Sequence, residues 1–127
     1  MSKRPIAVVT GGAGFIGSHM VDLLLERGFR VRVIDNLVGG RRENLARHRS
    51  NPDFFFKKKN ILECEPGDGL FRGARYVFHF AGVGDIVPSI ERPVEYLSAN
   101  VQGTVCALEC ARHAEVKKFV YTASSSC

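Results

Sequence analysis

The chain has 127 residues, of which 45% are hydrophobic and 24% charged, and its net charge is +5. This length fits one domain with a packed core. No apolar run is long enough to cross a bilayer, and no leader with a small-residue cleavage site begins the chain, so we expect a cytoplasmic protein with no membrane partner. The positive charge is scattered and lacks interleaved aromatic residues, which argues against nucleic acid and favours an anionic small ligand.

The first half of the chain alternates between strand and helix patterns. Residues 6–10 form a short apolar run with β-branched side chains, which predicts a buried strand. Helical spacing follows over 15–27, and Gly28 suits the end of that helix. We expect a second strand at 31–34, a short helical piece at 43–49 and a third strand at 53–57.

The second half begins less regularly, because Pro66, Gly67 and Gly69 interrupt residues 61–73. A fourth strand is expected at 76–80 and a fifth at 118–121. Between them a helix is predicted over 93–113, with Pro93 in its first turn, from the spacing of Val94, Leu97, Val101, Val105 and Leu108. The alternation predicts an α/β fold with a doubly wound parallel sheet covered on both faces.

Three glycines follow the first strand directly, at positions 11, 14 and 17. Ligands of such sheets bind beyond the carboxyl ends of the strands. Gly11 would permit a tight turn, Gly14 would let a pyrophosphate approach the backbone, and Gly17 would let the helix pack closely on the strand. The start of the helix would supply unpaired N–H groups for the phosphates. With Asp35 at the end of the second strand to accept from the ribose hydroxyls, the pattern predicts a Rossmann-type dinucleotide site.

Asp35 also bears on the choice of cofactor. Its carboxylate would repel a 2′-phosphate, so we expect NAD rather than NADP. Arg41 and Arg42 lie a few residues further on. They are either solvated loop residues, with or without a separate phosphate contact, or partners for a 2′-phosphate, and the sequence leaves these interpretations open.

The four cysteines are predicted to be reduced and buried rather than metal ligands. They are Cys64, Cys106, Cys110 and Cys127. Their spacing does not fit a zinc site, and no histidine stands beside Cys106 and Cys110 to complete one. Thiols in a cytosolic protein usually pack as small hydrophobic groups. We therefore expect no bound metal.

Several short motifs resemble the extended short-chain dehydrogenase/reductases, and within them the NAD-dependent nucleotide-sugar epimerases and dehydratases. They are TGGAGFIGSH at 10–19, DNLVGGRRENL from 35, HFAG at 79–82, SAN at 98–100 and SSS at 124–126. Together with the glycine motif, the resemblance implies cofactor contacts at Gly11, Gly14, Phe15, Ile16, Gly17, Asp35, Asn36, Asn60, Ile61, Phe80, Ala81, Gly82 and Asn100. Asn100 corresponds to a buried asparagine of this family. Ser124 would be catalytic, with Ser125 and Ser126 as alternatives, and Ser89 and Ser124 would contact the substrate.

The sequence also departs from the family pattern. Asn60 stands where an aspartate is usual, and Val83-Gly84 follows where many 4-epimerases have a lysine. The family's catalytic Tyr-x-x-x-Lys pair is missing, because Tyr76, Tyr96 and Tyr121 are followed four residues later by Phe, Asn and Ser. We therefore expect residues 1–127 to be the NAD-binding N-terminal part of a longer enzyme, with its sheet incomplete after the fifth strand and inactive by itself.

The resemblance implies a UDP-hexose 4-epimerase that acts through transient oxidation at C4 of the sugar. A nucleotide-sugar 4,6-dehydratase or a UDP-glucuronate decarboxylase of the same family is the alternative. A non-catalytic dinucleotide-binding module is an alternative from another class. A nucleotide sugar is the expected partner, and a homodimer is a family expectation for the full-length enzyme.

Overall fold

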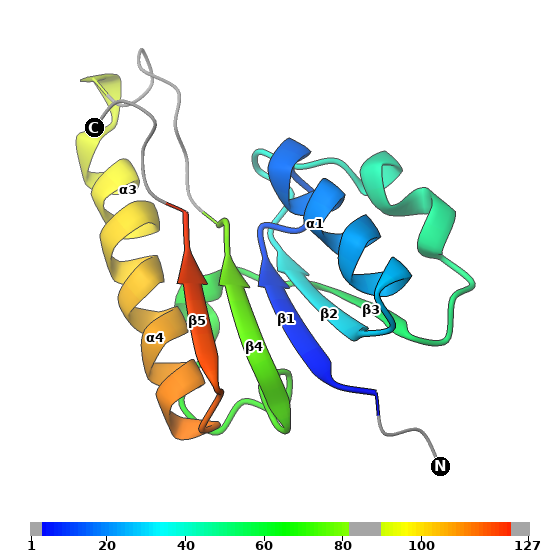
Figure 1. Cartoon of the computed structure of the whole chain (residues 1–127). Coiled ribbons are helices and arrows are strands. Elements are labelled where there is room, and N and C mark those ends of the chain that lie inside the picture. The colour runs from blue at the N-terminus through cyan, green and yellow to red at the C-terminus, as the bar shows by residue number, and fades with distance from the viewer. Residues whose placement is uncertain (1–3, 82–89, 123–127) are drawn as a thin grey trace.

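The structure, a computed structural model, describes residues 4–81 and 90–122 and is built around a five-stranded parallel sheet. The strand order is β3-β2-β1-β4-β5 (Figure 1). The strands span Ile6–Thr10 (β1), Arg30–Asp35 (β2), Phe54–Lys58 (β3), Ala74–His79 (β4) and Lys118–Tyr121 (β5). The predicted α/β fold and its five strands are confirmed, with small shifts of their bounds.

The side chains of β1 alternate between the two faces of the sheet, as the period of a strand requires. Ala7 and Val9 pack on the side of α1, Phe15–Glu26, whereas Val8 packs on the side of α4, Gly103–His113. The two helices lie on opposite sides of the sheet (Figure 1). Because both faces are covered, β1 reads as a continuous apolar run rather than an alternating one.

The first helix ends as its sequence predicts. Gly28 has φ +88° and donates its N–H to the carbonyl of Leu25 at 3.1 Å, and Phe29 donates to Leu24 at 2.9 Å. This pair of bonds is the Schellman motif, which satisfies carbonyls that the end of a helix otherwise leaves unpaired.

The two irregular stretches contain short 3₁₀ helices, η1 at Arg42–His48 and η2 at Ile61–Glu63. A side chain of the sheet stabilises the turns that follow η2. Arg32 of β2 donates to the carbonyls of Leu70 and Arg72 at 2.9 and 2.7 Å. A guanidinium that binds several carbonyls replaces the regular backbone pairing that this segment lacks.

The predicted helix over 93–113 is present but divided, and its packing corrects what its pattern suggested. It consists of α3 (Pro93–Leu97), a π-helical turn η3 (Ser98–Gln102) and α4. Its buried side consists of small residues, Gly103, Ala107, Cys110 and Ala111. The large apolar residues that predicted the helix, Val94, Leu97, Val101, Val105 and Leu108, are between 44% and 74% exposed. We call these five residues the apolar stripe.

The described cysteines are unpaired thiols, as the sequence predicted. Cys64 and Cys110 are buried and Cys106 is half-buried, whereas Cys127 lies outside the described residues. Burial raises the pKa of the Cys64 thiol to about 12 and that of Cys110 to about 11, so both stay protonated at neutral pH. Within the ranges 4–81 and 90–122, no helix combines the length and the apolar character that a membrane crossing needs.

Candidate functional site

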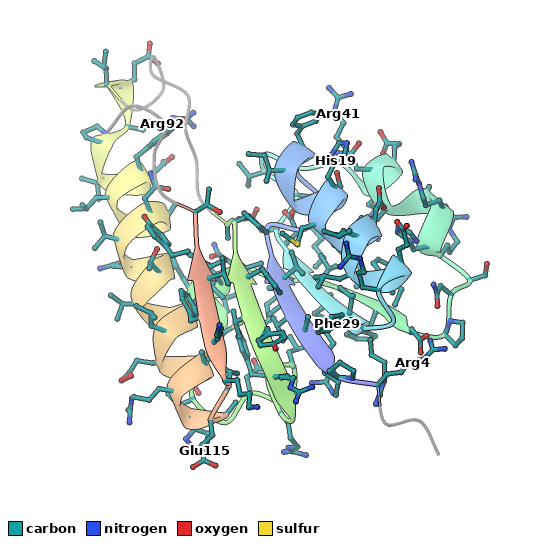
Figure 2. All side chains as sticks on the ribbon, viewed as in Figure 1. Arg4, His19, Phe29, Arg41, Arg92 and Glu115 are labelled. Carbon is teal, nitrogen blue, oxygen red and sulfur yellow. The ribbon has the colours of Figure 1, made fainter. Side chains whose placement is uncertain are left out.

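The carboxyl ends of the strands meet at one edge of the sheet, and a cleft of about 760 Å³ opens there. Arg41 and His19 lie at this edge, close to the start of α1, whereas Arg4 and Glu115 lie at the opposite edge (Figure 2). His19 is exposed, and its ring lies edge-on against Phe15 with 4.8 Å between the ring centroids. The cleft volume falls in the range of small-molecule and cofactor sites.

The turn between β1 and α1, Gly11–Gly14, lies against the end of β4, and at Gly11 the contact leaves no room for a side chain. Gly11 has φ +70°, and a Cβ built there would lie 2.7 Å from the amide nitrogen of Ala81. A Cβ at Gly17 would lie 2.2 Å from the carbonyl oxygen of Gly11, so α1 packs directly on the turn. We call residues 11–14 the glycine turn.

The start of α1 faces the cleft without a side-chain cap. Gly14 is its N-cap residue and lines the cleft, and within residues 4–81 and 90–122 no side chain caps the helix there. An uncapped helix N-terminus combines N–H donors with the positive end of the helix dipole. This arrangement suits the phosphates of a ligand.

Asp35 at the end of β2 holds the glycine turn as well as lining the cleft. Its Oδ2 accepts from the Ala13 N–H at 2.9 Å, and its Oδ1 accepts from the Leu37 N–H at 2.7 Å. The residue is only 7% exposed. Each carboxylate oxygen can accept a further hydrogen bond. The two oxygens could therefore accept hydrogen bonds from two ribose hydroxyls and keep their bonds to the backbone.

The loop after β2 closes over the same turn. The carbonyl of Ala13 accepts from Arg41 N–H at 3.0 Å and from the Asn44 amide at 2.8 Å. The segment of Val38, Gly39 and Gly40 contributes to the cleft wall. These three residues belong to the DNLVGGRRENL motif, from which only Asp35 and Asn36 were assigned cofactor contacts.

Asn60 and Ile61 form another side of the cleft. Asn60 caps η2, because its Oδ1 accepts from Leu62 N–H at 3.0 Å while its own N–H donates to Glu63 at 3.1 Å. The Oδ1 atom of Asn60 therefore already has a partner within η2. The NH₂ group of Asn60 can still donate a hydrogen bond to a ligand, which an aspartate carboxylate could not do. Ile61 is 6% exposed and belongs to the core on the α4 side.

Lys59 lines the cleft but directs its amine elsewhere. The ammonium donates to Asp68 at 2.7 Å, and this hydrogen bond raises the pKa of Lys59. Its backbone N–H donates to the carbonyl of Asp35 at 3.1 Å. Lys59 therefore ties the loop after β3 to the end of β2.

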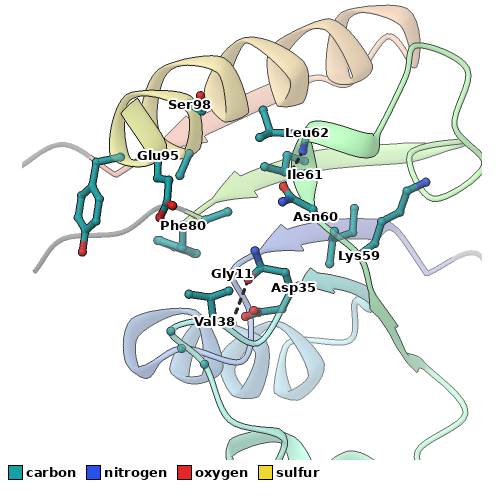
Figure 3. A pocket seen from close by; sticks show the side chains of 18 of the residues that line it. Gly11, Asp35, Val38, Lys59, Asn60, Ile61, Leu62, Phe80, Glu95 and Ser98 are labelled. Carbon is teal, nitrogen blue, oxygen red and sulfur yellow. Dashed lines mark hydrogen bonds between the residues drawn. The ribbon is translucent and has the colours of Figure 1, made fainter. Parts of the chain in front are cut away.

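The remaining walls come from the end of β4 and from α3 and η3. Phe80 and Ala81 line the cleft beside the glycine turn. Figure 3 shows Asp35 and Val38 on the side of that turn, Glu95 and Ser98 on the side of α3 and η3, and Phe80 and Asn60 between them. Ser98 belongs to the SAN motif, from which only Asn100 was assigned a cofactor contact, and no sequence signal pointed to Glu95.

The structure brings most of the predicted cofactor residues together. Those that line the cleft are Gly11, Gly14, Asp35, Asn36, Asn60, Ile61, Phe80 and Ala81. Phe15 and Ile16 expose their side chains, and Gly17 is buried beneath the turn. Gly82, Ser89, Ser124, Ser125 and Ser126 lie outside the described residues.

Asn100 requires a correction. It was expected to be a buried asparagine linked to the cofactor, but it is exposed and does not line the cleft. Its backbone carbonyl accepts from the Thr104 hydroxyl at 2.7 Å. Asn100 lies within the π-helical turn η3, and its neighbours Ser98 and Ala99 line the cleft instead.

Arg41 and Arg42 do not line the cleft. Arg41 is exposed, and the Arg42 guanidinium lies 5.0 Å from the centre of the Phe56 ring beside a separate hollow. This cation–π contact favours the interpretation of Arg42 as a loop residue over a 2′-phosphate partner.

These features fit a dinucleotide. The carboxylate of Asp35 at the end of β2 can accept from two hydroxyls, and the uncapped N-terminus of α1 faces the cleft. Between Asp35 and the helix, two glycines of the turn leave the backbone accessible. The cleft lies where the strand order reverses between β1 and β4, which is where ligands of doubly wound sheets bind.

Comparison with known proteins gives one consistent result. The model of the NAD dependent epimerase/dehydratase family matches residues 7–127. UDP-glucose 4-epimerase of Yersinia enterocolitica is 38% identical over 94% of this chain and 37% of its own length. UDP-glucuronic acid decarboxylase 2 of Arabidopsis thaliana is 37% identical over 93% of this chain and 25% of its own length.

A solved structure is similar over nearly the same range. The UDP-N-acetylglucosamine 4-epimerase from Methanobrevibacter ruminantium, in complex with UDP-N-acetylmuramic acid, has a TM-score of 0.89 at 30% identity. The match covers 98% of this chain and 39% of that one. The chain spans between 19% and 37% of the length of the curated relatives it matches.

Proposed function

The chain belongs to the NAD dependent epimerase/dehydratase family, and from this we propose that it forms the NAD-binding part of a nucleotide-sugar 4-epimerase that acts on UDP-hexoses. NAD is the cofactor of this family, as the sequence predicted. Residues 1–127 are the proposed NAD-binding domain.

Asp35 carries the cofactor part of the proposal. Its buried carboxylate is held by two backbone N–H groups and keeps acceptor capacity toward the cleft. We assign the adenosine ribose to Asp35 and Asn36, the adenine to Asn60 and Ile61, and the pyrophosphate to the glycine turn and the N–H groups of Phe15, Ile16 and Gly17. Phe80, Ala81 and Gly82 would then border the ribose and nicotinamide.

When bound, NAD supplies a hydride acceptor for the oxidation of C4 of the sugar. The residues of this chain bind and orient it and exclude water from the floor of the cleft. Dehydratases and decarboxylases of the family share this first oxidation, and the similarity to a UDP-glucuronic acid decarboxylase keeps those reactions as the second candidate. Family membership argues against a module that only binds dinucleotides.

The catalytic base is not among these residues. Residues 1–127 contain no tyrosine followed four positions later by lysine, so we expect them to show no epimerase turnover by themselves. We assign a sugar hydroxyl contact to Ser124, with Ser125 and Ser126 as alternatives, and a further substrate contact to Ser89. These serines lie outside the described residues.

We also propose that the full-length protein is a homodimer. The apolar stripe crosses the outer side of α3, η3 and α4 with spacings of three and four residues, the pattern of helices that pack against other helices. A second copy of the same helix would cover it symmetrically.

The ribose assignment is tested by replacing Asp35 in the protein at its natural length. Asp35→Ala removes acceptors for both ribose hydroxyls and the charge that repels a 2′-phosphate, so NAD affinity falls by at least about tenfold more than NADP affinity. Titration calorimetry with both cofactors measures this. Asp53→Ala is the matched control, because Asp53 pairs with Arg4 at the opposite edge of the sheet. Equal losses for NAD and NADP would contradict the assignment.

A further inference from the structure

A row of polar groups, buried at Thr10 and His79 and half-buried at Thr104, joins β1, β4 and α4 behind the cleft. Thr10 and His79 are 0% and 1% exposed. Thr10 Oγ1 lies 2.7 Å from His79 Nδ1, and His79 Nε2 lies 3.0 Å from Thr104 Oγ1. The Thr104 hydroxyl donates in turn to the carbonyl of Asn100 at 2.7 Å.

The front end of this row holds two residues of the cleft. The backbone N–H of Ala81 donates to Thr10 Oγ1 at 3.1 Å, and the N–H of Phe80 is shared between Thr10 Oγ1 at 3.1 Å and the Thr10 carbonyl at 2.9 Å. Phe80 and Ala81, which we call the β4 wall, lie directly on the glycine turn, where no Cβ fits at Gly11. Thr10 therefore holds the β4 wall through its hydroxyl as well as through its backbone carbonyl.

The hydrogen bonds can be assigned donor by donor. A hydroxyl has two acceptor positions and one hydrogen, and Thr10 Oγ1 accepts from Ala81 and shares the N–H of Phe80 with the Thr10 carbonyl. The partner left for its hydrogen is His79 Nδ1, which then carries none. At the other end, the Thr104 hydrogen goes to Asn100, so Thr104 accepts and His79 Nε2 must carry a hydrogen.

The surroundings of His79 agree with this assignment. Burial lowers the pKa of His79 to about 4, which leaves the ring neutral at neutral pH. The rings of Phe119 and Tyr121 lie against it, with centroid distances of 5.8 and 6.1 Å. A neutral ring carries one hydrogen, as the geometry requires.

We propose that His79 is a positioning residue for the cofactor site. Thr104 fixes it in the form with the hydrogen on Nε2, and its bare Nδ1 orients the Thr10 hydroxyl so that this hydroxyl holds the β4 wall against the glycine turn. The row thereby connects the start of α4, which does not line the cleft, to residues that do. The inference rests on the proposed NAD site for its effect on binding, whereas the form of His79 is independent of it.

The first test reads the ring directly in the protein at its natural length. With ¹⁵N-labelled histidine, NMR correlation of ring nitrogens and carbon-bound protons distinguishes the two neutral forms from the cation. We expect a bare Nδ1 and a protonated Nε2 for His79 from about pH 8 down to about pH 5. His19, His48 and His113 serve as internal comparisons. A hydrogen on Nδ1, or a charged ring at neutral pH, would overturn the proposal.

The second test removes the far end of the row. Thr104→Val leaves His79 Nε2 without its acceptor, whereas Thr104→Ser keeps the hydroxyl. We expect Thr104→Val to accelerate amide hydrogen exchange at Phe80 and Ala81 and to weaken NAD binding by about tenfold, and Thr104→Ser to change neither by more than about twofold. Unchanged exchange and affinity in Thr104→Val would refute the role of the row.

Replacing the His79 ring distinguishes the effect of the lost Nδ1 acceptor from the effect of the lost side-chain volume. His79→Leu removes both ring nitrogens, whereas His79→Asn returns an acceptor oxygen near the place of Nδ1. Slower exchange at Phe80 and Ala81 in His79→Asn than in His79→Leu supports the assignment, and equal exchange in the two variants contradicts it. If the unaltered protein binds no NAD, the proposed function fails, but the NMR and exchange results still decide this inference.

Discussion

At the scale of single residues, the glycines of the TGGAGFIGSH motif serve two different physical needs. Gly11 combines a positive φ with contact to the β4 wall, whereas Gly17 has its close contact inside a helix. The second need is steric alone. Any side chain at position 17 must separate α1 from the glycine turn, and the start of the helix then moves away from the cleft.

Gly17→Ala is therefore expected to be costly despite the high helix propensity of alanine. Its Cβ would meet a backbone carbonyl at 2.2 Å, so we expect a loss of at least about 2 kcal/mol in the free energy of unfolding. Gly69→Ala is the matched control, because no atom lies within 4 Å of a Cβ there, and its effect should stay within about 0.5 kcal/mol. Urea unfolding of both variants measures the difference. Similar stabilities would show that α1 can shift at little cost.

Asp35 shows what a sequence can and cannot reveal about one side chain. Its place after the second strand and its distance from the glycines were enough to predict a carboxylate beside the glycine turn, where the structure has it lining the cleft. Nothing in the sequence indicated its bonds to Ala13 and Leu37, because these depend on how the loop folds back over the turn. The exposure of Asn100 was likewise not predicted, because local pattern does not reveal the π-helical turn in which it lies.

At the scale of elements, the long helix shows why periodicity predicts a helix better than it predicts the buried side. The apolar stripe is genuine, but the side that meets the core is lined by Gly103, Ala107, Cys110 and Ala111. A Cβ at Gly103 would lie 3.0 Å from Ile61 of η2, so the approach is too close for large side chains. Small residues pack this contact and large ones remain outside.

The apolar stripe gives the prediction at this scale. In the full-length protein we expect Val101→Glu combined with Leu108→Glu to convert a dimer into a monomer, because two charges would be buried without partners, at a cost of at least about 2 kcal/mol. Sedimentation velocity measures the change. Gln102→Glu, at an exposed site beside the stripe, should leave the dimer intact. A monomeric unaltered protein, or a variant that stays dimeric, would contradict the proposal.

At the scale of the whole molecule, the site follows from topology. The order β3-β2-β1-β4-β5 reverses between β1 and β4, and the glycine turn and the β4 wall stand on the two sides of that reversal. Alternating strand and helix patterns were sufficient to predict a doubly wound parallel sheet and the edge formed by the carboxyl ends of its strands, but not the strand order. They could not predict which parts of α3 and η3 close the cleft, because those contacts join segments far apart in the chain.

The polar row of Thr10, His79 and Thr104 also affects global stability, because His79 titrates differently in the folded and unfolded chains. Burial lowers its pKa from 6.5 to about 4, so the folded state favours the neutral ring. Above about pH 6.5 the ring is neutral in both states, and this residue adds no pH dependence. Between pH 6.5 and about 4 only the unfolded chain takes up the proton, so stability falls as the pH falls.

The contribution of His79 can be isolated by comparison with His79→Asn, which does not titrate. The free energy of unfolding of the unaltered protein should decrease through this window more steeply than that of the variant, by at most about 1.4 kcal/mol per pH unit. Urea unfolding at a series of pH values measures both curves. Parallel curves would mean that His79 takes up its proton equally in both states, and the ring would then be accessible to water. Curves that converge toward pH 4 would show that the folded chain keeps the ring neutral, as its burial requires.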